Sequence, residues 1–181
     1  ERDADDPRIA HTLTLETDEL GNVLQGVSVV YPRQKTEGLL EDVLNDNQAV
    51  RNAKKHGRDQ QQKMWITLTQ NDFTKDLIKP QSYYLRKGWQ TKTYELTGIK
   101  PANKKFSIAE IKTQLTDLQE IEYQQKADNA TPQKRLIEHI KTKFYNADLT
   151  APLPDGQMAA RAMAFEAYQL AYTPNLLADI F

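Results

Sequence analysis

The chain contains no cysteine, which removes a set of chemistries from consideration. Disulfide bonds, thiol nucleophiles and cysteine-ligated metal centres are excluded. Its three histidines are too few and too scattered to indicate a metal site. The seven glycines are dispersed, so they form no phosphate-binding loop. None of the serines considered as nucleophiles sits in the glycine-flanked turn typical of hydrolases: Ser28, Ser82 and Ser107.

The sequence also lacks the excess of positive charge that indicates a nucleic-acid partner. It lacks the long apolar runs that indicate a membrane span. The 24 basic and 25 acidic residues give a net charge of −1, so we expect no nucleic-acid partner. No apolar run approaches the roughly 20 residues of a membrane span, and no signal peptide is visible, so we expect no direct membrane insertion. Since the chain starts at Glu1 and not at methionine, we expect residues 1–181 to be a single domain cut from a longer polypeptide.

The clearest local pattern is a pair of alternating runs around a turn. Alternation with a period of two is typical of a strand with one buried face. Residues of one parity are mostly apolar in both runs: Ile9, His11, Leu13 and Leu15 in the first, and Val23, Val27, Val29 and Tyr31 in the second. Gly21, in the turn 18–22, adopts a positive backbone angle without steric cost. The sequence therefore predicts a β-hairpin over 8–31.

The rest of the chain predicts an α+β fold. We expect an antiparallel sheet of four or five strands, in which the hairpin is joined by strands near 63–71, 83–96 and 134–145. We expect helices near 107–123, 160–172 and 174–180 to pack on this sheet. The first of these helices begins with a capping box, formed by Ser107 and Glu110.

Three segments are harder to interpret. The polar stretch 32–62 predicts a mobile loop, within which a short helix that ends near Gly57 could start from a few apolar residues: Leu39, Leu40, Val43 and Leu44. Segment 133–146 fits either a helix or a strand, because its apolar residues are spaced by four and also share strand parity. Segment 157–172 is rich in helix-favouring residues, and the choice between helix and strand stays open there too.

Several residues fit a functional site, and each also has a structural interpretation. His11 is either a buried base or a strand histidine bonded to a neighbour. The pair Glu120 and Glu122 matches the Glu-x-Glu of ADP-ribosyltransferases, but the upstream arginine and the Ser-Thr-Ser strand that accompany it are not apparent. Trp65 and Trp89 are suited either to stacking on sugars or to packing in a sheet.

Two clusters of charged residues also have both a functional and a structural interpretation. The basic run 54–58 is typical of a solvated loop, although it also fits a phosphate. Asp3, Asp5 and Asp6 lack the spacing of a calcium loop. We therefore predict no catalytic, cofactor-binding or metal-binding residue, and no enzyme activity.

Several segments together resemble one known family, in the same order along the chain. The strongest is DPRIAHTLTLETDELGNVLQGVSVVYPR, and the others include QQQKMWITLTQNDFT, TYELTG, FSIAEI, KRLIEH and FEAYQLAYTP; they lie at 6–33, 60–74, 93–98, 106–111, 134–139 and 165–174. They resemble the middle/C-terminal region of the B component of bacterial insecticidal toxin complexes, of the TcdB/TcaC type, which adjoins RHS (or YD) repeats. The chain departs from that pattern at Ala164, where proline is expected, and at 85–89, where proline and cysteine are expected.

This resemblance implies a strand for 134–145 and a structural role for the chain. In that family the B and C components build a hollow RHS shell around the toxic C-terminal part of C, and a β-propeller of B docks on the pore-forming A component. We therefore expect a secreted, non-catalytic scaffold segment whose partners are the rest of its own polypeptide, the C component and, through the complex, the A component. The alternatives are a β-rich module that binds carbohydrate or protein, and a cryptic hydrolase.

Overall fold

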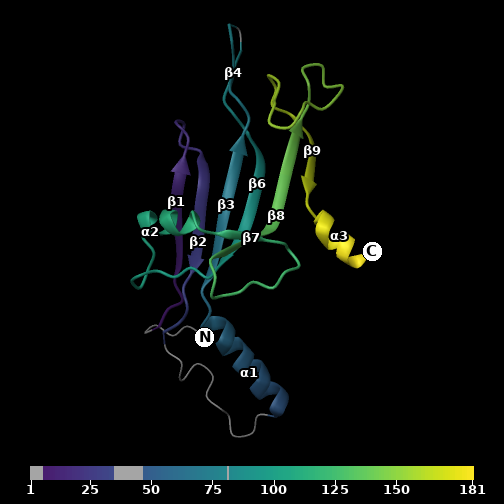
Figure 1. Cartoon of the computed structure of the whole chain (residues 1–181). Helices are drawn as coiled ribbons and strands as arrows, with labels where there is room; N and C mark the ends of the chain where they lie inside the picture. Colours follow the sequence, from purple (N-terminus) through teal and green to yellow (C-terminus); the bar gives the residue numbers. More distant parts are fainter. Residues whose placement is uncertain (1–5, 35–46, 81) are drawn as a thin grey trace.

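A computed structural model describes residues 6–34, 47–80 and 82–181 of the chain. Their fold is α+β, as predicted, with one large sheet, a separate two-stranded ribbon and three helices (Figure 1). The large sheet contains β1 (Ala10–Thr17), β2 (Val23–Val30), β3 (Trp65–Phe73), β6 (Gly88–Thr97), β7 (Gln119–Ile121), β8 (Gln133–Phe144) and β9 (Ala164–Gln169). The ribbon is β4 (Leu77–Lys79) with β5 (Ser82–Tyr84), and the helices are α1 (Gln48–Gln61), α2 (Ile108–Leu115) and α3 (Pro174–Ile180). None of these helices has the length and apolar character needed to cross a bilayer.

The large sheet is mostly antiparallel. Its strand order is β1-β2-β3-β6-β8-β7, and β9 pairs with the far half of β8. Only the short pairing of β7 with β8 is parallel among the described strands. The β4–β5 ribbon extends beyond the end of the sheet as a continuation of β3 and β6 (Figure 1).

The predicted hairpin over 8–31 is confirmed as β1 and β2. Gly21 has φ +84°, a backbone angle that favours glycine, and Asp18 closes the turn. The Asp18 Oδ1 atom accepts hydrogen bonds from the backbone N–H groups of Leu20 and Asn22, both at 2.9 Å. The strand predicted near 134–145 and the helix predicted near 174–180 are likewise confirmed, as β8 and α3.

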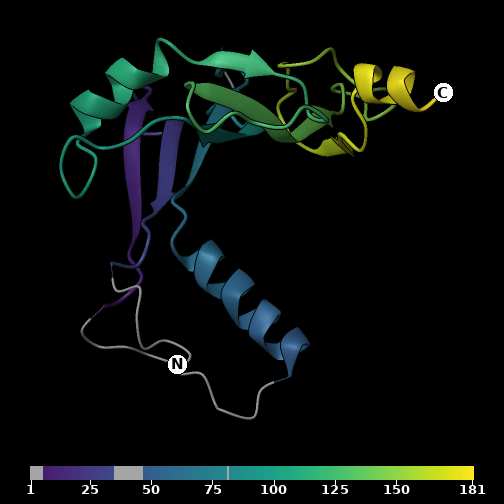
Figure 2. The same ribbon diagram turned by 60° about the horizontal axis from the view of Figure 1, so that its bottom comes forward.

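The core lies on one face of the sheet, beneath α2 (Figure 2). Cross-strand pairing lines up one apolar row through five neighbouring strands: Leu13, Val27, Leu68, Tyr94 and Leu136. Phe106, just before α2, and Ile111, within α2, cover these side chains. Ile111 is completely buried. Burial of this row and its cover is the main source of stability, since apolar area removed from water contributes roughly 25 cal/mol per Å².

Two helix predictions need correction. The helix predicted over 160–172 is wrong, because residues 164–169 form strand β9. Pairing with the long strand β8 satisfies the backbone hydrogen-bonding groups of these residues. This tertiary pairing outweighs the helix propensity of the segment, which is a weak effect by comparison. The helix predicted over 107–123 is too long: α2 ends at Leu115, and the chain then enters β7. Its predicted capping box, Ser107 with Glu110, is present.

The loop prediction for 32–62 also needs correction, since residues 48–61 form α1. Asn47 caps this helix by accepting a hydrogen bond from the N–H of Val50 at 3.0 Å. No residue of α1 is buried, and the helix points away from the sheet (Figure 2). The apolar residues proposed as a helix seed lie at 39–44, outside the described residues. The strand predicted over 83–96 is divided between β5 and β6.

Candidate functional site

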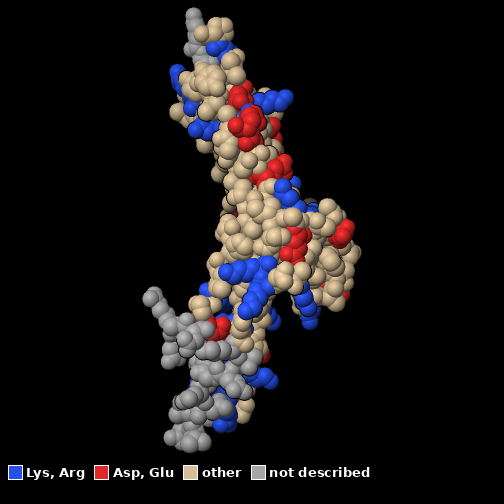
Figure 3. All heavy atoms as spheres, turned by 90° about the vertical axis from the view of Figure 1, so that its left-hand side faces the viewer, with Lys and Arg blue, Asp and Glu red and all other residues tan. Residues whose placement is uncertain are grey.

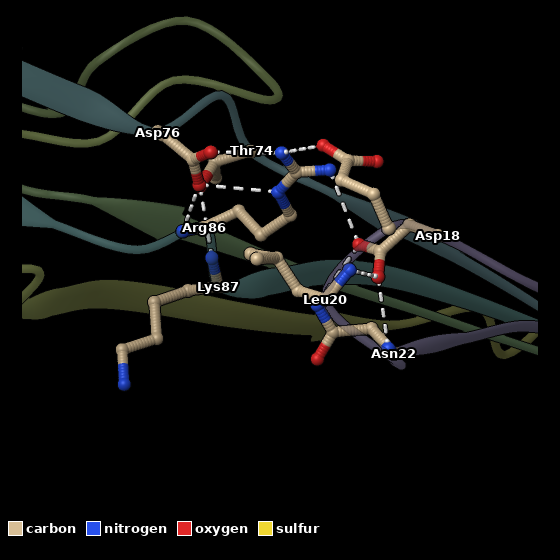
Figure 4. Close-up of polar contacts among 8 residues, drawn as sticks. Asp18, Leu20, Asn22, Thr74, Asp76, Arg86 and Lys87 are labelled. Carbon is tan, nitrogen blue, oxygen red and sulfur yellow. Dashed lines mark hydrogen bonds and ion pairs between the residues drawn. The ribbon is translucent and has the colours of Figure 1, made fainter.

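Charged side chains are unevenly distributed over the surface. Acidic atoms gather toward the end of the sheet that carries the β4–β5 ribbon, and basic atoms are more frequent toward the other end (Figure 3). The acidic end contains the densest set of ion pairs among the described residues. It consists of Asp18, Glu19, Asp76 and Arg86, which we call the Arg86 cluster (Figure 4).

Arg86 is the centre of this cluster. Its Nε atom lies 3.1 Å from Asp76 Oδ1, and its Nη2 atom lies 2.7 Å from Asp76 Oδ2, a bidentate pair. Its Nη1 atom donates to Asp18 Oδ2 at 3.1 Å, and Nη2 also contacts Glu19. One guanidinium thus joins the β1–β2 turn to the base of the β4–β5 ribbon.

Backbone N–H groups and a side-chain amide add to the hold of Arg86 on the two aspartates. Asp18 is fixed by its turn, where the side-chain amide of Asn22 donates to Asp18 Oδ2 at 2.9 Å. Asp76 accepts the backbone N–H of Arg86 at 2.7 Å. Thr74 and Lys87 close the ribbon beside them, through a backbone bond of 2.8 Å and a bond of 3.0 Å from the Lys87 N–H to Thr74 Oγ1. The cluster is therefore a rigid joint.

These contacts determine the ionisation of the cluster. Hydrogen bonding from the Asn22 side chain, reinforced by backbone N–H groups and Arg86, lowers the pKa of Asp18. Hydrogen bonds from the Arg86 side chain and backbone lower the pKa of Asp76. The side-chain hydrogen bonds of Arg86 to Asp76 and Glu19 raise the pKa of Arg86. The two aspartates are thus ionised and paired at neutral pH, a state that suits a structural clamp better than proton transfer.

A second polar row crosses three strands on the α2 side of the sheet. His139 Nε2 lies 2.8 Å from Gln90 Oε1, and the Gln90 side-chain amide donates to Asp72. Partial burial, together with the charges of Lys92 and Lys141, lowers the pKa of His139. These residues come from β3, β6 and β8, and no sequence spacing indicated that they would meet.

The histidine and glutamate candidates occupy structural positions. His11 lies 3.1 Å from the hydroxyl of Tyr31, which also accepts the backbone N–H of Phe106 at 2.9 Å. Glu120 lies in β7, not at a helix end, and forms an ion pair with Lys134 at 3.0 Å. Glu122 follows the strand. The structure thus gives Glu120 a cross-strand partner, Lys134.

The remaining candidates are dispersed. The basic run 54–58 lies on α1. Among the N-terminal aspartates, Asp6 accepts a hydrogen bond from the backbone N–H of Gln34 at 3.1 Å, and Asp3 and Asp5 lie outside the described residues. Trp89 packs on Gly156 and has the ammonium of Lys141 5.7 Å from its ring centre. Within the described part of the chain, no group of three or more side chains is arranged to hold a metal ion.

Comparison with known proteins supports the resemblance in the sequence. Residues 1–86 match the profile of a family described as the insecticide toxin TcdB middle/C-terminal region. Among curated proteins no sequence matches the chain. Two solved structures share its fold: TcdB2-TccC3 without the hypervariable C-terminal region, with a TM-score of 0.63, and TcdB2-TccC3-Cdc42, with a TM-score of 0.60. Each is 20% identical over 97% of this chain, and the alignment spans 8% of the other chain.

Proposed function

We propose, from the match of residues 1–86 to the insecticide toxin TcdB region, that this chain is a non-catalytic structural segment of a toxin-complex B component. In this proposal the segment contributes to the RHS-type shell that encloses and delivers a toxic C-terminal effector. Its partners are then the rest of its own polypeptide and the toxin-bearing C component, and through the assembled complex the A component. The complex would act outside the bacterial cell.

The position of the fold in much longer chains supports this proposal. The segment aligns along nearly its whole length with the two toxin structures, yet it corresponds to a small fraction of their chains. The matched family region includes the hairpin, β3 and the ribbon, together with all four members of the Arg86 cluster. The Arg86 cluster joins the β1–β2 turn to the base of the β4–β5 ribbon, which is consistent with a structural role.

The observation that carries the proposal is an exposed apolar surface beside an unpaired sheet edge. In the described part of the chain β9 pairs only with β8, so its outer edge has no strand partner. Large apolar side chains lie exposed on β9, on α3, in the segment between them and directly after α3, and we call them the C-terminal strip: Tyr168, Leu170, Tyr172, Leu177, Ile180 and Phe181. A groove of about 480 Å³ runs between this strip and β8. An exposed apolar patch next to a free edge is typical of a surface that another segment covers.

Substitution in the C-terminal strip tests the proposal. Tyr172→Lys and Leu177→Lys change side chains that are 60% and 41% exposed, so the isolated chain should keep its stability. In the full-length parent polypeptide the same changes should place charges in a covered apolar surface, and the yield and thermal stability of its complex with the C component should fall. Val50→Lys on α1, at a position 38% exposed, is the matched control. Normal assembly of both strip variants would contradict the proposal, as would hydrolysis of a polysaccharide or covalent modification of a protein by the isolated chain.

A further inference from the structure

Trp65 lies beside a groove that the proposed scaffold role does not use. The groove has a volume of about 490 Å³ and lies where β3 begins and β6 ends. Trp65 and Thr97 are the residues next to the paired Ile66 and Leu96, so both border this opening. The indole of Trp65 is 42% exposed, although the next residue, Ile66, is buried in the core.

Three lysines reach this groove from three different connections. Lys63 precedes β3, Lys100 follows β6, and Lys126 lies between β7 and β8. All three are exposed, and none has a carboxylate within ion-pair distance among residues 6–34, 47–80 and 82–181. Three cations that converge without a counter-ion favour an anionic ligand.

Arg135 holds one wall of the groove in place. Its Nε atom donates to Glu95 at 3.1 Å, so the carboxylate in the groove is already neutralised. Its Nη1 atom donates to the carbonyl oxygens of Tyr123, at 3.3 Å, and Gln125, at 3.1 Å. These bonds tie the connection that carries Lys126 to the sheet. The lysines therefore supply the unpaired charge, and Arg135 supplies the rigidity.

Thr97 also borders the groove. Its hydroxyl oxygen is enclosed by the protein and has no hydrogen-bond partner among the described residues. This oxygen is therefore not open to a ligand, and recognition in the groove depends on Trp65 and the lysines.

Strand pairing decides which kind of ligand fits. β3 pairs with β2 and β6, and β6 pairs with β3 and β8, so neither strand has a free edge at the groove. An extended peptide that recognises a sheet does so through such an edge. The groove offers instead a flat aromatic face and cationic side chains. A sugar ring presents an apolar C–H face that packs on an indole, and the acidic groups of a charged sugar pair with lysines.

We propose that this groove, lined by Lys63, Trp65, Thr97, Lys100 and Lys126, binds an acidic oligosaccharide. A pyranose ring packs against Trp65, and the sulfate or carboxylate groups of the sugar pair with the three lysines. The proposal goes beyond the scaffold role and does not depend on it. Two acidic sources share this chemistry, sulfated sugars and uronic-acid sugars, and the experiment separates them.

The test is a titration of the 181-residue chain with three defined hexasaccharides: a heparin fragment, a hyaluronan fragment and neutral maltohexaose. Binding is measured by calorimetry and by tryptophan fluorescence in a Trp89→Phe background, in which Trp65 is the remaining tryptophan. We expect at least one acidic hexasaccharide to bind and to change the Trp65 emission, and maltohexaose to bind much more weakly. Which acidic sugar binds identifies sulfate or carboxylate as the recognised group.

Variants separate the groove from general attraction to lysines. Replacing Lys63, Lys100 and Lys126 together by Gln should raise the Kd by about tenfold or more, since each removes an ionic contact worth a few-fold. Trp65→Phe, which keeps a smaller ring, should retain more affinity than Trp65→Ala. The matched control replaces three exposed lysines outside the groove by Gln: Lys79, Lys104 and Lys105. Equal weakening by the two triple variants would overturn the proposal, as would failure of all three sugars to bind the folded chain or an unchanged Trp65 emission at saturation.

Discussion

Gly98→Ala should destabilise the chain far more than an ordinary glycine substitution. Gly98 follows β6 with φ +73°, a conformation in which an L-residue is strained by roughly 1–2 kcal/mol. An added Cβ would also lie 1.9 Å from the carbonyl oxygen of Thr131 and 2.7 Å from the nitrogen of Pro132. Both obstacles are backbone atoms, so no side-chain rotation relieves the clash.

The size of the effect follows from what must move. Thr131 and Pro132 would have to shift by at least about 1 Å to reach a normal contact distance. The carbonyl of Pro132 accepts the N–H of Gln119 at 3.0 Å, and Gln133 begins β8 opposite Thr97. Strain plus the loss of one or two such hydrogen bonds gives a loss of about 3 kcal/mol or more in the free energy of unfolding.

Gly21→Ala is the matched control, because it separates backbone strain from the clash. Gly21 has a similar angle, φ +84°, but an added Cβ would meet no atom within 4 Å. Urea unfolding followed by circular dichroism gives both free energies, provided that the m-value is unchanged. We expect Gly98→Ala to lose about 2 kcal/mol more than Gly21→Ala. Equal losses would refute the close approach of Gly98 to the 131–132 backbone.

Three further predictions concern the clamp, the core and the polar row. Arg86→Gln should lower the urea midpoint clearly more than Lys87→Gln, a change at the exposed neighbouring residue. Loss of the Arg86 charge leaves Asp18 and Asp76 without their shared cation. Equal midpoints for the two variants would argue against the clamp. Ile111→Ala should lower the free energy of unfolding by about 2–5 kcal/mol. Ile108 lies on the same helix but is 46% exposed, so Ile108→Ala should cost much less. Similar losses for the two variants would mean that the core lies elsewhere. His139 has a lowered pKa in the fold, so the unfolded chain binds more protons; stability should therefore fall as pH drops through about 6.5 and level off below the folded pKa. His139→Gln should flatten that part of a stability–pH curve, and an unchanged curve would show that another group causes it.

The hairpin and the last helix were predicted correctly from local signals, whereas the family resemblance decided the strand near 134–145. The hairpin 8–31 combines alternation with a glycine turn, and Gly21 has the positive φ that the turn requires. Helix α3 begins with Thr173 as its cap and Pro174 in its first turn, both visible in the sequence. Such signals need no knowledge of distant residues.

The elements missed depend on partners far away in the chain or on weak signals. β9 exists because residues 164–169 pair with β8, and this pairing cannot be read from their helix-favouring composition. α1 has a polar sequence without an apolar stripe that packs on the body, so the sequence favoured only a short helix ending near Gly57 and did not give the bounds of α1. Strand pairing places polar side chains from distant positions together, as in the Arg86 cluster, where Asp18 meets Arg86. Arg86 itself lies in the segment 85–89, which had been noted only as a departure from the family pattern.

Hydrogen–deuterium exchange tests the central claim, that the chain is a supporting segment of a larger shell, most directly. The experiment compares the 181-residue chain alone with the same residues inside the full-length parent polypeptide bound to its C component. We predict that β9 and α3 exchange quickly in the isolated chain and become strongly protected in the complex, because other segments then cover the C-terminal strip. Residues of β3, already paired on both sides, should be protected in both samples. Equally fast exchange of β9 and α3 in the complex would contradict the scaffold role.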